Sequence, residues 1–222
     1  MCLGLRSNKF VVLAALRRQP NDLASHQKKI DKIDEHMGVA MSGLTADGRS
    51  IIKYLRSEAL NNKYVYGQNI QGSRVVADLA DMHQRCTQSY VRRPYGVGLL
   101  IASYDQTGPH LYVTEPSGNY FEYLAMAIGS RSQTSRTYLE KEFKNFEQAS
   151  LEDLIKHAVK GVAVSLAGDA ELDAKSTSVA VVGENQQFKF LTEAEIQRVL
   201  DEITVAETAA ESTEMVIENP DL

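Results

Sequence analysis

The 222-residue sequence predicts an α+β domain in which two antiparallel sheets pack face to face between two layers of helices. Three observations favour this four-layer αββα sandwich. The strand-like run FVVLAAL, residues 10–16, is apolar on both faces, so its sheet must be covered on both sides. Segments with helical periodicity come mostly in pairs between groups of strand-like runs. Short turn sequences connect neighbouring runs, which is typical of antiparallel pairing.

The N-terminal part is predicted to contain four strands. Residues 3–7 and 10–16 are separated by a turn-like Asn-Lys pair, which favours a β-hairpin. After a polar stretch, residues 28–34 and 37–44 form two more short strand-like runs. We therefore expect the chain to enter its first helix from a strand.

Two amphipathic helices follow. The first is expected from Thr45, which is placed to act as its N-cap, and the second from Ser73. His83 and Cys86 lie three residues apart on or near the apolar stripe of the second helix, a spacing that two metal ligands could use. No further cysteine or carboxylate cluster accompanies them, so we interpret both as core residues and expect no metal or cofactor.

The middle block, residues 95–129, contains three strand-like runs divided by the turn sequences DQTGP and EPSGN, which predicts an antiparallel meander. Beyond it, SRSQ, SLED and TEAE have the spacing of capping boxes and predict helix starts at Ser130, Ser150 and Thr192. Between the last two helices, residues 176–183 and 187–191 supply another pair of strands. No internal repeat, glycine-rich phosphate loop or linker interrupts this order, so one domain is sufficient.

The composition excludes several classes of protein. No apolar run approaches the ~20 residues needed to cross a bilayer, and the N-terminus lacks the pattern of a secretory signal, so we expect a soluble, intracellular protein without a membrane partner. The only two cysteines, Cys2 and Cys86, predict neither a disulfide framework nor a metal site.

The charge of the chain is unevenly distributed. The formal net charge is −5, but seven acidic residues and no basic residue follow Arg198. Without these seven, 24 basic residues face 22 acidic ones, and such a balance argues against a nucleic-acid partner. We expect one folded domain over residues 1–203 and a disordered acidic tail over residues 204–222.

Residues 92–140 carry motifs that resemble the α-type subunits of the 20S proteasome. These are RPYGV before a strand, a D-x-x-G-P turn, PSG before another strand, and AIGSRSQ at a helix start. QKKIDKID, SGLTADGR, GSRVVADLAD and CTQSY precede them in the expected order, so the resemblance spans about residues 3–203. QKKI, ADLADMHQRCTQ and the AIGSRSQ helix start are most similar to the α type 1 members, which occupy the sixth position of the eukaryotic ring.

This resemblance implies the fold of the N-terminal-nucleophile hydrolases and a role without catalysis. In this family, different α subunits form an outer ring that caps a ring of β subunits and controls the entry of unfolded polypeptide during ubiquitin-dependent degradation. It implies that the partners are neighbouring α subunits, a β-ring subunit and the C-terminal tails of activators, and that the protein is located in the cytoplasm and nucleus.

The sequence departs from the family pattern at three places, one of which is the tail after Ile203, where no family motif is found. Family members begin further upstream, with a gate-forming tail and a first helix, so an incomplete gene model and a truncated isoform that does not assemble both stay open. Gly48 in ADGR replaces the usual alanine, and a glycine in an early helical turn costs up to about 1 kcal/mol.

A second alternative makes Cys2 the nucleophile of an active hydrolase. The active β-type relatives use an N-terminal threonine whose own α-amine is the base, assisted by an aspartate and a lysine. The resemblance places Leu16 where that aspartate is required, and Cys2 two positions inside the place of the nucleophile. No Gly-Thr dipeptide marks a processing site. We therefore expect no catalytic residue in this chain.

Lys29 matches the position of the catalytic lysine of the β-type subunits. In α-type subunits, the resemblance implies that a lysine at this place lines a pocket between neighbouring subunits, together with the Gly-Leu pair, here Gly43 and Leu44. This pocket receives the C-terminal tail of an activator. An ammonium group can form a charge-assisted hydrogen bond with a terminal carboxylate, and backbone at a glycine can be approached closely. The alternative is that Lys29 is one more solvated lysine beside Lys28 and Lys32.

Overall fold

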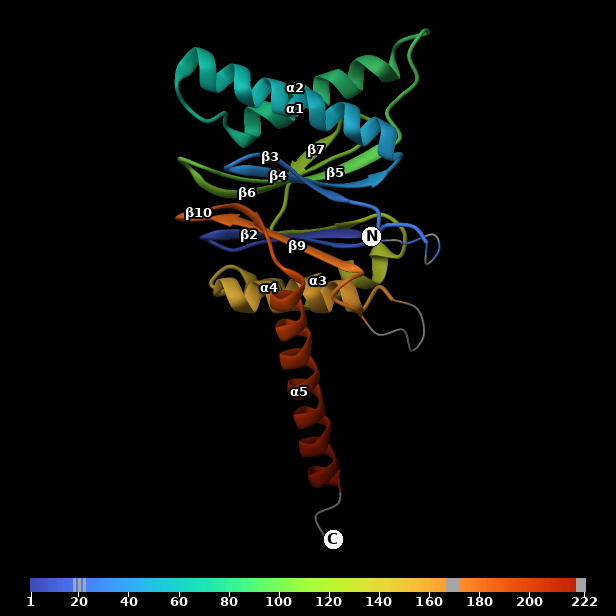
Figure 1. Cartoon of the computed structure of the whole chain (residues 1–222), viewed down its shortest axis with the longest axis vertical. Coiled ribbons are helices and arrows are strands. Elements are labelled where there is room, and N and C mark those ends of the chain that lie inside the picture. Colours follow the sequence, from blue (N-terminus) through green and yellow to red (C-terminus); the bar gives the residue numbers. More distant parts are fainter. Residues whose placement is uncertain (18, 20, 22, 167–171, 219–222) are drawn as a thin grey trace.

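The computed structural model describes residues 1–17, 19, 21, 23–166 and 172–218, with side chains as far as residue 205. Its elements lie in four layers, with a pair of helices on each side of two stacked sheets (Figure 1). The predicted αββα sandwich and its antiparallel strand pairing are therefore confirmed. Among the described residues, no helix combines the length and the apolar character that crossing a membrane requires.

The first sheet has the strand order β10-β9-β2-β1-β8. Helices α3 (Ser132–Phe146) and α4 (Leu151–Ala163) cover its outer face (Figure 1). Its strands are β1 (Cys2–Arg6), β2 (Phe10–Leu16), β8 (Ala125–Ile128), β9 (Thr177–Gly183) and β10 (Gln186–Phe190).

The second sheet has the order β3-β4-β5-β6-β7, and helices α1 (Thr45–Tyr66) and α2 (Gly72–Thr87) cover it. Strand β3 forms one edge of this sheet and β7 the other. Its strands are β3 (Ile30–Asp34), β4 (Met37–Gly43), β5 (Val97–Asp105), β6 (Gly108–Thr114) and β7 (Tyr120–Glu122).

Strand β2 shows why the run FVVLAAL is apolar on both faces. Val12 and Ala14 belong to the core between the first sheet and its helices. Val11, Leu13 and Ala15 alternate with them and belong to the core between the two sheets. A third core lies between the second sheet and helices α1 and α2. The two-faced burial expected from the sequence is confirmed.

The middle block contains four strands rather than the three that were predicted. Strands β5, β6 and β7 form the expected meander, but β8 leaves it and pairs with β1 in the other sheet. The change of sheet occurs between two consecutive residues. Tyr123 N donates to Leu111 O in β6 over 2.9 Å, whereas Leu124 O accepts from Arg6 N in β1 over 2.7 Å. The segment YFEYLAMAI contains no glycine or proline, so the sequence carries no turn signal at this switch.

Two of the predicted helix starts are confirmed. Ser150 Oγ accepts from Asp153 N over 3.2 Å and is the N-cap of α4. At α5 (Glu193–Glu218), Thr192 Oγ1 accepts from Glu195 N over 3.3 Å, and Glu195 Oε2 accepts from Thr192 N over 2.7 Å. This reciprocal pair is a complete capping box.

Two other predicted caps are wrong. Leu44 is the N-cap of α1, and Thr45 lies inside the first turn, where its hydroxyl accepts a hydrogen bond from Gln27 Nε2. At α3, Arg131 is the N-cap with a φ of 59°, and Ser130 lies outside the helix. In both cases the N-cap lies one residue away from the position that the capping pattern predicts.

Helix α5 differs from the expected boundary at residue 203. Its backbone is helical to Glu218 and projects away from the sandwich (Figure 1), whereas a disordered tail was predicted from residue 204. Residues 193–218 contain no glycine or proline and are rich in alanine and glutamate, which favour helix. Residues 219–222, the end of the predicted tail, lie outside the described part of the chain.

Candidate functional site

A cavity of about 240 Å³ lies at the end of the sandwich where β4 enters helix α1. It brings together the segment before β3, the last residues of β4 and the first residue after Gly129. The lining residues are Met1, Gln27, Lys28, Lys29, Met41, Ser42, Gly43, Thr45 and Ser130. Lys29 and Gly43, two of the three residues predicted for the tail pocket, therefore line one cavity.

Gly43 is required by the backbone at this place. Its φ is 135°, and a Cβ atom at this position would lie 2.2 Å from the carbonyl oxygen of Gly96. That same carbonyl accepts a hydrogen bond of 2.8 Å from Leu44 N. The loop before β5 thus packs directly on the backbone of residues 43 and 44, and only glycine permits this approach.

Leu44, the third predicted pocket residue, does not line the cavity. Its side chain is 54% exposed and leans over the loop before β5, since a Cβ atom at Gly96 would lie 2.7 Å from Leu44 Cδ1. Leu44 therefore supports the wall of the cavity from outside.

Lys29 is 9% exposed. Among the described residues, no carboxylate forms an ion pair with its ammonium group. The strand register holds its backbone, because Met41 N donates to Lys29 O over 2.8 Å. A lysine that is largely buried, lines a cavity and has no internal counter-ion can bind an anion from outside the chain.

Cys2 lies close to this cavity but does not have the setting of a nucleophile. It is 0% exposed, and its Sγ donates to the Met41 carbonyl oxygen over 3.2 Å. Burial raises the pKa of the Cys2 thiol, and the positive charge of Lys29 opposes only part of this effect. Leu16, in the position where the resemblance requires an aspartate, bonds through its backbone to Met1 O over 3.2 Å. Thiolate formation is therefore disfavoured, and Leu16 offers no carboxylate.

His83 and Cys86 lie in the core, as interpreted from the sequence. His83 is fully buried, and its Nδ1 lies 3.0 Å from the carbonyl oxygen of Glu115. Its ring packs against Tyr95 with 5.1 Å between the ring centroids. Within the described ranges, no group of three His, Cys, Asp or Glu side chains could hold a metal ion.

The model of the proteasome subunit family matches residues 1–182. The chain belongs to the proteasome subunit family. Proteasome subunit alpha type-1 of Dictyostelium discoideum is 48% identical over 200 residues, which cover 90% of this chain and 81% of that protein. The proteins of the same name from Trypanosoma brucei rhodesiense and Drosophila melanogaster are both 43% identical, over 90% and 86% of this chain and 75% and 69% of their own lengths.

These relatives confirm the resemblance to α-type proteasome subunits, which are non-catalytic structural components of the 20S core. The similarity to the α type 1 members was carried in the sequence by QKKI and ADLADMHQRCTQ. The residues matched by the family model include the whole second sheet, strands β1, β2 and β8 of the first sheet, and all the residues around the Lys29 cavity.

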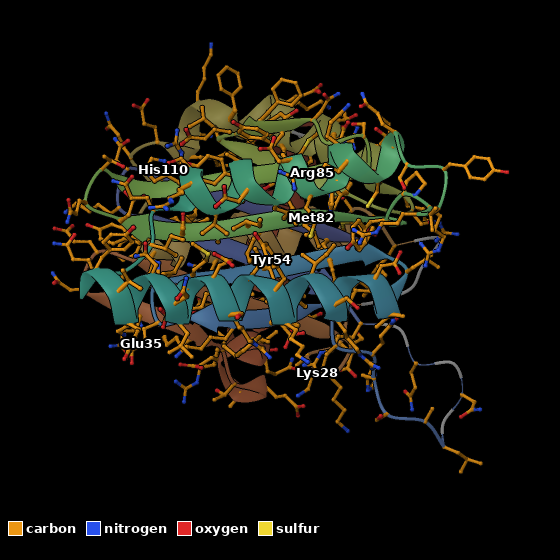
Figure 2. All side chains as sticks on the ribbon, turned by 90° about the horizontal axis from the view of Figure 1, so that it is seen from above. Lys28, Glu35, Tyr54, Met82, Arg85 and His110 are labelled. Carbon is orange, nitrogen blue, oxygen red and sulfur yellow. The ribbon has the colours of Figure 1, made fainter. Side chains whose placement is uncertain are left out.

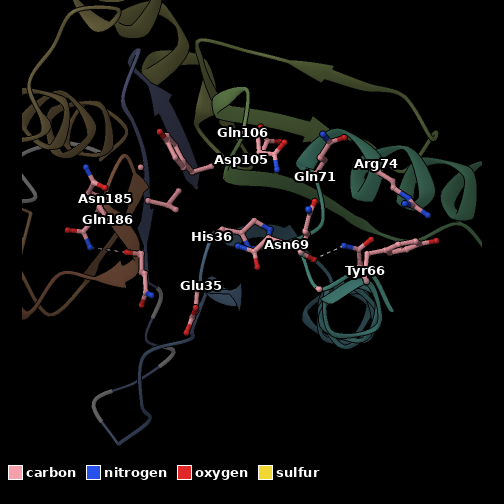
Figure 3. Close-up of a pocket in the computed structure, with 17 residues that line it drawn as sticks. Glu35, His36, Tyr66, Asn69, Gln71, Arg74, Asp105, Gln106, Asn185 and Gln186 are labelled. Carbon is pink, nitrogen blue, oxygen red and sulfur yellow. Dashed lines mark hydrogen bonds between the residues drawn. The ribbon is translucent and has the colours of Figure 1, made fainter. Parts of the chain in front are cut away.

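This proteasome subunit has a larger cavity at the opposite end of β4, which the sequence did not predict. It has a volume of about 1080 Å³ and is lined by turns of both sheets and by the end of α1 (Figure 3). Eight of its lining side chains are amides, namely Asn62, Gln68, Asn69, Gln71, Gln106, Asn185, Gln186 and Gln187. They come from helix α1, strand β10 and several turns, so no continuous sequence pattern signals them.

Proposed function

We propose that the chain is a non-catalytic subunit of the α ring of the 20S proteasome. In this role it contributes surface to assembly, takes part in the control of substrate entry and provides a docking site for activators. The environment of Cys2 is the observation that supports the absence of catalysis. This residue is fully buried, and its thiol donates a hydrogen bond to a backbone carbonyl. The chain would thus be an inactive component of a threonine-type endopeptidase complex.

The Lys29 cavity is proposed to receive the C-terminal carboxylate of an activator tail. Lys29 supplies the positive charge, and Gly43 allows the tail backbone to approach the rim. The cavity of about 240 Å³ has room for the end of a peptide rather than for a folded domain. Leu44 takes part indirectly, through its contact with the loop at Gly96.

The exposed apolar residues support the proposed partners, which are neighbouring α subunits and a β-ring subunit. Tyr64 at the end of α1 is 89% exposed, and Tyr90 and Val91 in the loop after α2 are 106% and 90% exposed. Exposed aromatic side chains such as these are enriched at protein–protein interfaces. We propose a location in the cytoplasm and nucleus, where such particles degrade proteins.

Assembly and inactivity are tested with the tagged full chain expressed in its source cells. We expect it to co-purify with 20S particles, and we expect the isolated chain to hydrolyse fluorogenic peptides no faster than Cys2→Ala. Peptidase activity that disappears in Cys2→Ala would contradict the absence of catalysis. A chain that never enters particles would contradict the structural role.

The docking site is tested with core particles that contain the chain or its Lys29→Ala variant. We expect the variant to bind a peptide with a free C-terminal carboxylate about tenfold more weakly, since a charge-assisted hydrogen bond is lost. Lys32→Ala is the matched control, because Lys32 is an exposed lysine on β3 outside the cavity. Equal affinity of wild type and Lys29→Ala would overturn the assignment of the pocket.

A further inference from the structure

A second cavity adjoins the Lys29 cavity and has a volume of about 620 Å³. The two share the lining residues Gln27, Lys28, Met41 and Thr45. Gln27 Nε2 donates to Thr45 Oγ1, so this hydrogen bond joins two residues of the common wall. An extended ligand that ends in the first cavity can continue into the second.

The second cavity carries a concentration of positive charge that the neutral body of the chain does not predict. Arg49, Lys53 and Arg56 are spaced four and three residues apart, and thus lie on one face of α1. Lys28 adds a fourth cation from the segment before β3, on the side of α1 away from α2 (Figure 2). Among the described residues of the lining, Asp31 alone is acidic.

Most of this charge has no counter-ion within the described chain. Arg56 pairs with Asp31 over 3.3 Å and donates from Nε and Nη2 to the carbonyl oxygen of Lys32 over 2.9 and 2.7 Å. Among the described residues, Lys28, Arg49 and Lys53 form no ion pair, and all three are exposed. Three solvated cations therefore surround one cavity and can bind carboxylates.

The floor of the second cavity is apolar. Met41 and Ile52 line it and are 6% and 4% exposed. A ligand that fits both the floor and the rim has apolar groups and negative charges at short intervals. This pattern is that of an acidic peptide rather than of a small inorganic anion.

We propose that the second cavity binds acidic side chains that precede the C-terminal carboxylate held at Lys29. The preferred partner is then a peptide tail with glutamate or aspartate upstream of its free end. An extended peptide advances about 3.3 Å per residue, so side chains that precede the terminal carboxylate along the peptide can reach the adjoining cavity. The inference rests on the proposed tail pocket and names the class of tail that it selects.

A nucleic acid fits the cavity less well than a peptide. Among the described residues, the cavity lining contains no tyrosine, phenylalanine or tryptophan on which a base could stack. Gln27 and Thr45, in contrast, offer donors and acceptors to a peptide backbone.

The proposal is tested with core particles that contain the chain and with four decapeptides. Two peptides end in a free carboxylate and two in an amide, and within each pair one has three glutamates upstream and the other three glutamines. Each carries a photoreactive benzoylphenylalanine, and cross-linking to this chain is titrated. We expect the glutamate peptides to bind about tenfold more tightly, since each exposed charge pair contributes a factor of about two to three.

Charge-reversal variants test whether Arg49 and Lys53 bind the acidic side chains of the peptide. Arg49→Glu with Lys53→Glu should abolish the preference for glutamate, and peptides with three lysines should then bind better than those with glutamine. Lys141→Glu with Lys144→Glu is the matched control, because both residues are exposed on α3 and cover the other sheet. An equal loss in this control would show a non-specific charge effect and would overturn the proposal.

The peptide series tests the second cavity and the Lys29 pocket separately. A preference for the carboxylate end without a preference for glutamate would overturn the second cavity and leave the Lys29 pocket standing. A preference for glutamate in both amide and carboxylate peptides, with no effect of the end group, would support the acidic-peptide cavity and contradict the Lys29 pocket. Tighter, Arg49- and Lys53-dependent binding of an oligouridylate would show a polyanion site and overturn the peptide assignment.

Discussion

Arg93 and Asp47 form a bidentate ion pair, with 2.7 Å between Nη1 and Oδ2 and 2.8 Å between Nη2 and Oδ1. Asp47 Oδ2 also accepts a hydrogen bond of 2.9 Å from Gly96 N. The pair joins the first turn of α1 to the loop before β5, which contacts Gly43 and Leu44. Two motifs that are 46 residues apart thus fix the wall of the Lys29 cavity together.

Asp47→Asn should lower stability by about 1 kcal/mol at neutral pH, a modest value because solvent around Arg93 screens the pair. The hydrogen bonds from Arg93 and Gly96 lower the pKa of Asp47 from 3.8 to about 2. A carboxyl group whose pKa is lower in the folded state than in the unfolded state stabilises the fold at pH values above its unfolded pKa. This stabilisation is lost as the pH falls through the pKa of the folded state. The difference between wild type and Asp47→Asn should therefore shrink between about pH 4 and pH 2.

Urea unfolding between pH 2 and pH 7 measures this difference. Asp78→Asn is the control, because Asp78 is exposed on α2 and forms no ion pair with a described residue. A difference between wild type and Asp47→Asn that stays constant down to pH 2 would contradict the role of the carboxylate.

Gly43→Ala should destabilise the chain by about 2 kcal/mol or more, because it combines an unfavourable φ with a backbone clash at Gly96. Gly108→Ala separates the two causes. Gly108 has a φ of 117°, but a Cβ atom there would meet no heavy atom within 4 Å. Thermal unfolding should show a smaller loss for Gly108→Ala, and equal losses would mean that the contact with Gly96 has no energetic effect.

Gly48→Ala should raise the free energy of unfolding by less than the value of about 1 kcal/mol that helix propensity allows. A Cβ atom at Gly48 would lie 2.5 Å from Met41 Sδ, so the methionine must move. In a Met41→Ala background the same change should recover the full gain, and a double-mutant cycle in urea measures the coupling. Additive effects would show that Met41 does not explain the glycine in ADGR.

Cys2 should react with iodoacetamide far more slowly in the native chain than in the unfolded chain. The thiol is 0% exposed, and burial raises its pKa, so the reactive thiolate is scarce at neutral pH. Mass spectrometry of labelled peptides measures the rate, and Cys86, which is 5% exposed, serves as a second buried thiol. Rapid labelling of Cys2 in the folded chain would contradict its position in the core.

The sequence by itself determined the class of the fold and the family. Apolar alternation depends on local chemistry, so the two-faced burial of FVVLAAL predicted a strand covered by another sheet and by helices. The capping box at Thr192 was also readable, because all its partners lie within four residues. The family motifs additionally identified Lys29 and Gly43 as residues of one cavity.

Only the tertiary structure decided the features that depend on contacts between distant segments. The passage of β8 into the other sheet follows from its pairing with β1, more than 100 positions away, and no local signal marks it. The displaced cap at Thr45 and the exclusion of Leu44 from the cavity have the same origin, since Gln27 and Gly96 meet these residues only after folding. Such contacts outweigh local preferences because packing energies are larger than those of capping and propensity. The second cavity, beside Lys29, likewise forms only because helix α1 and the segment before β3 lie next to each other in the folded chain.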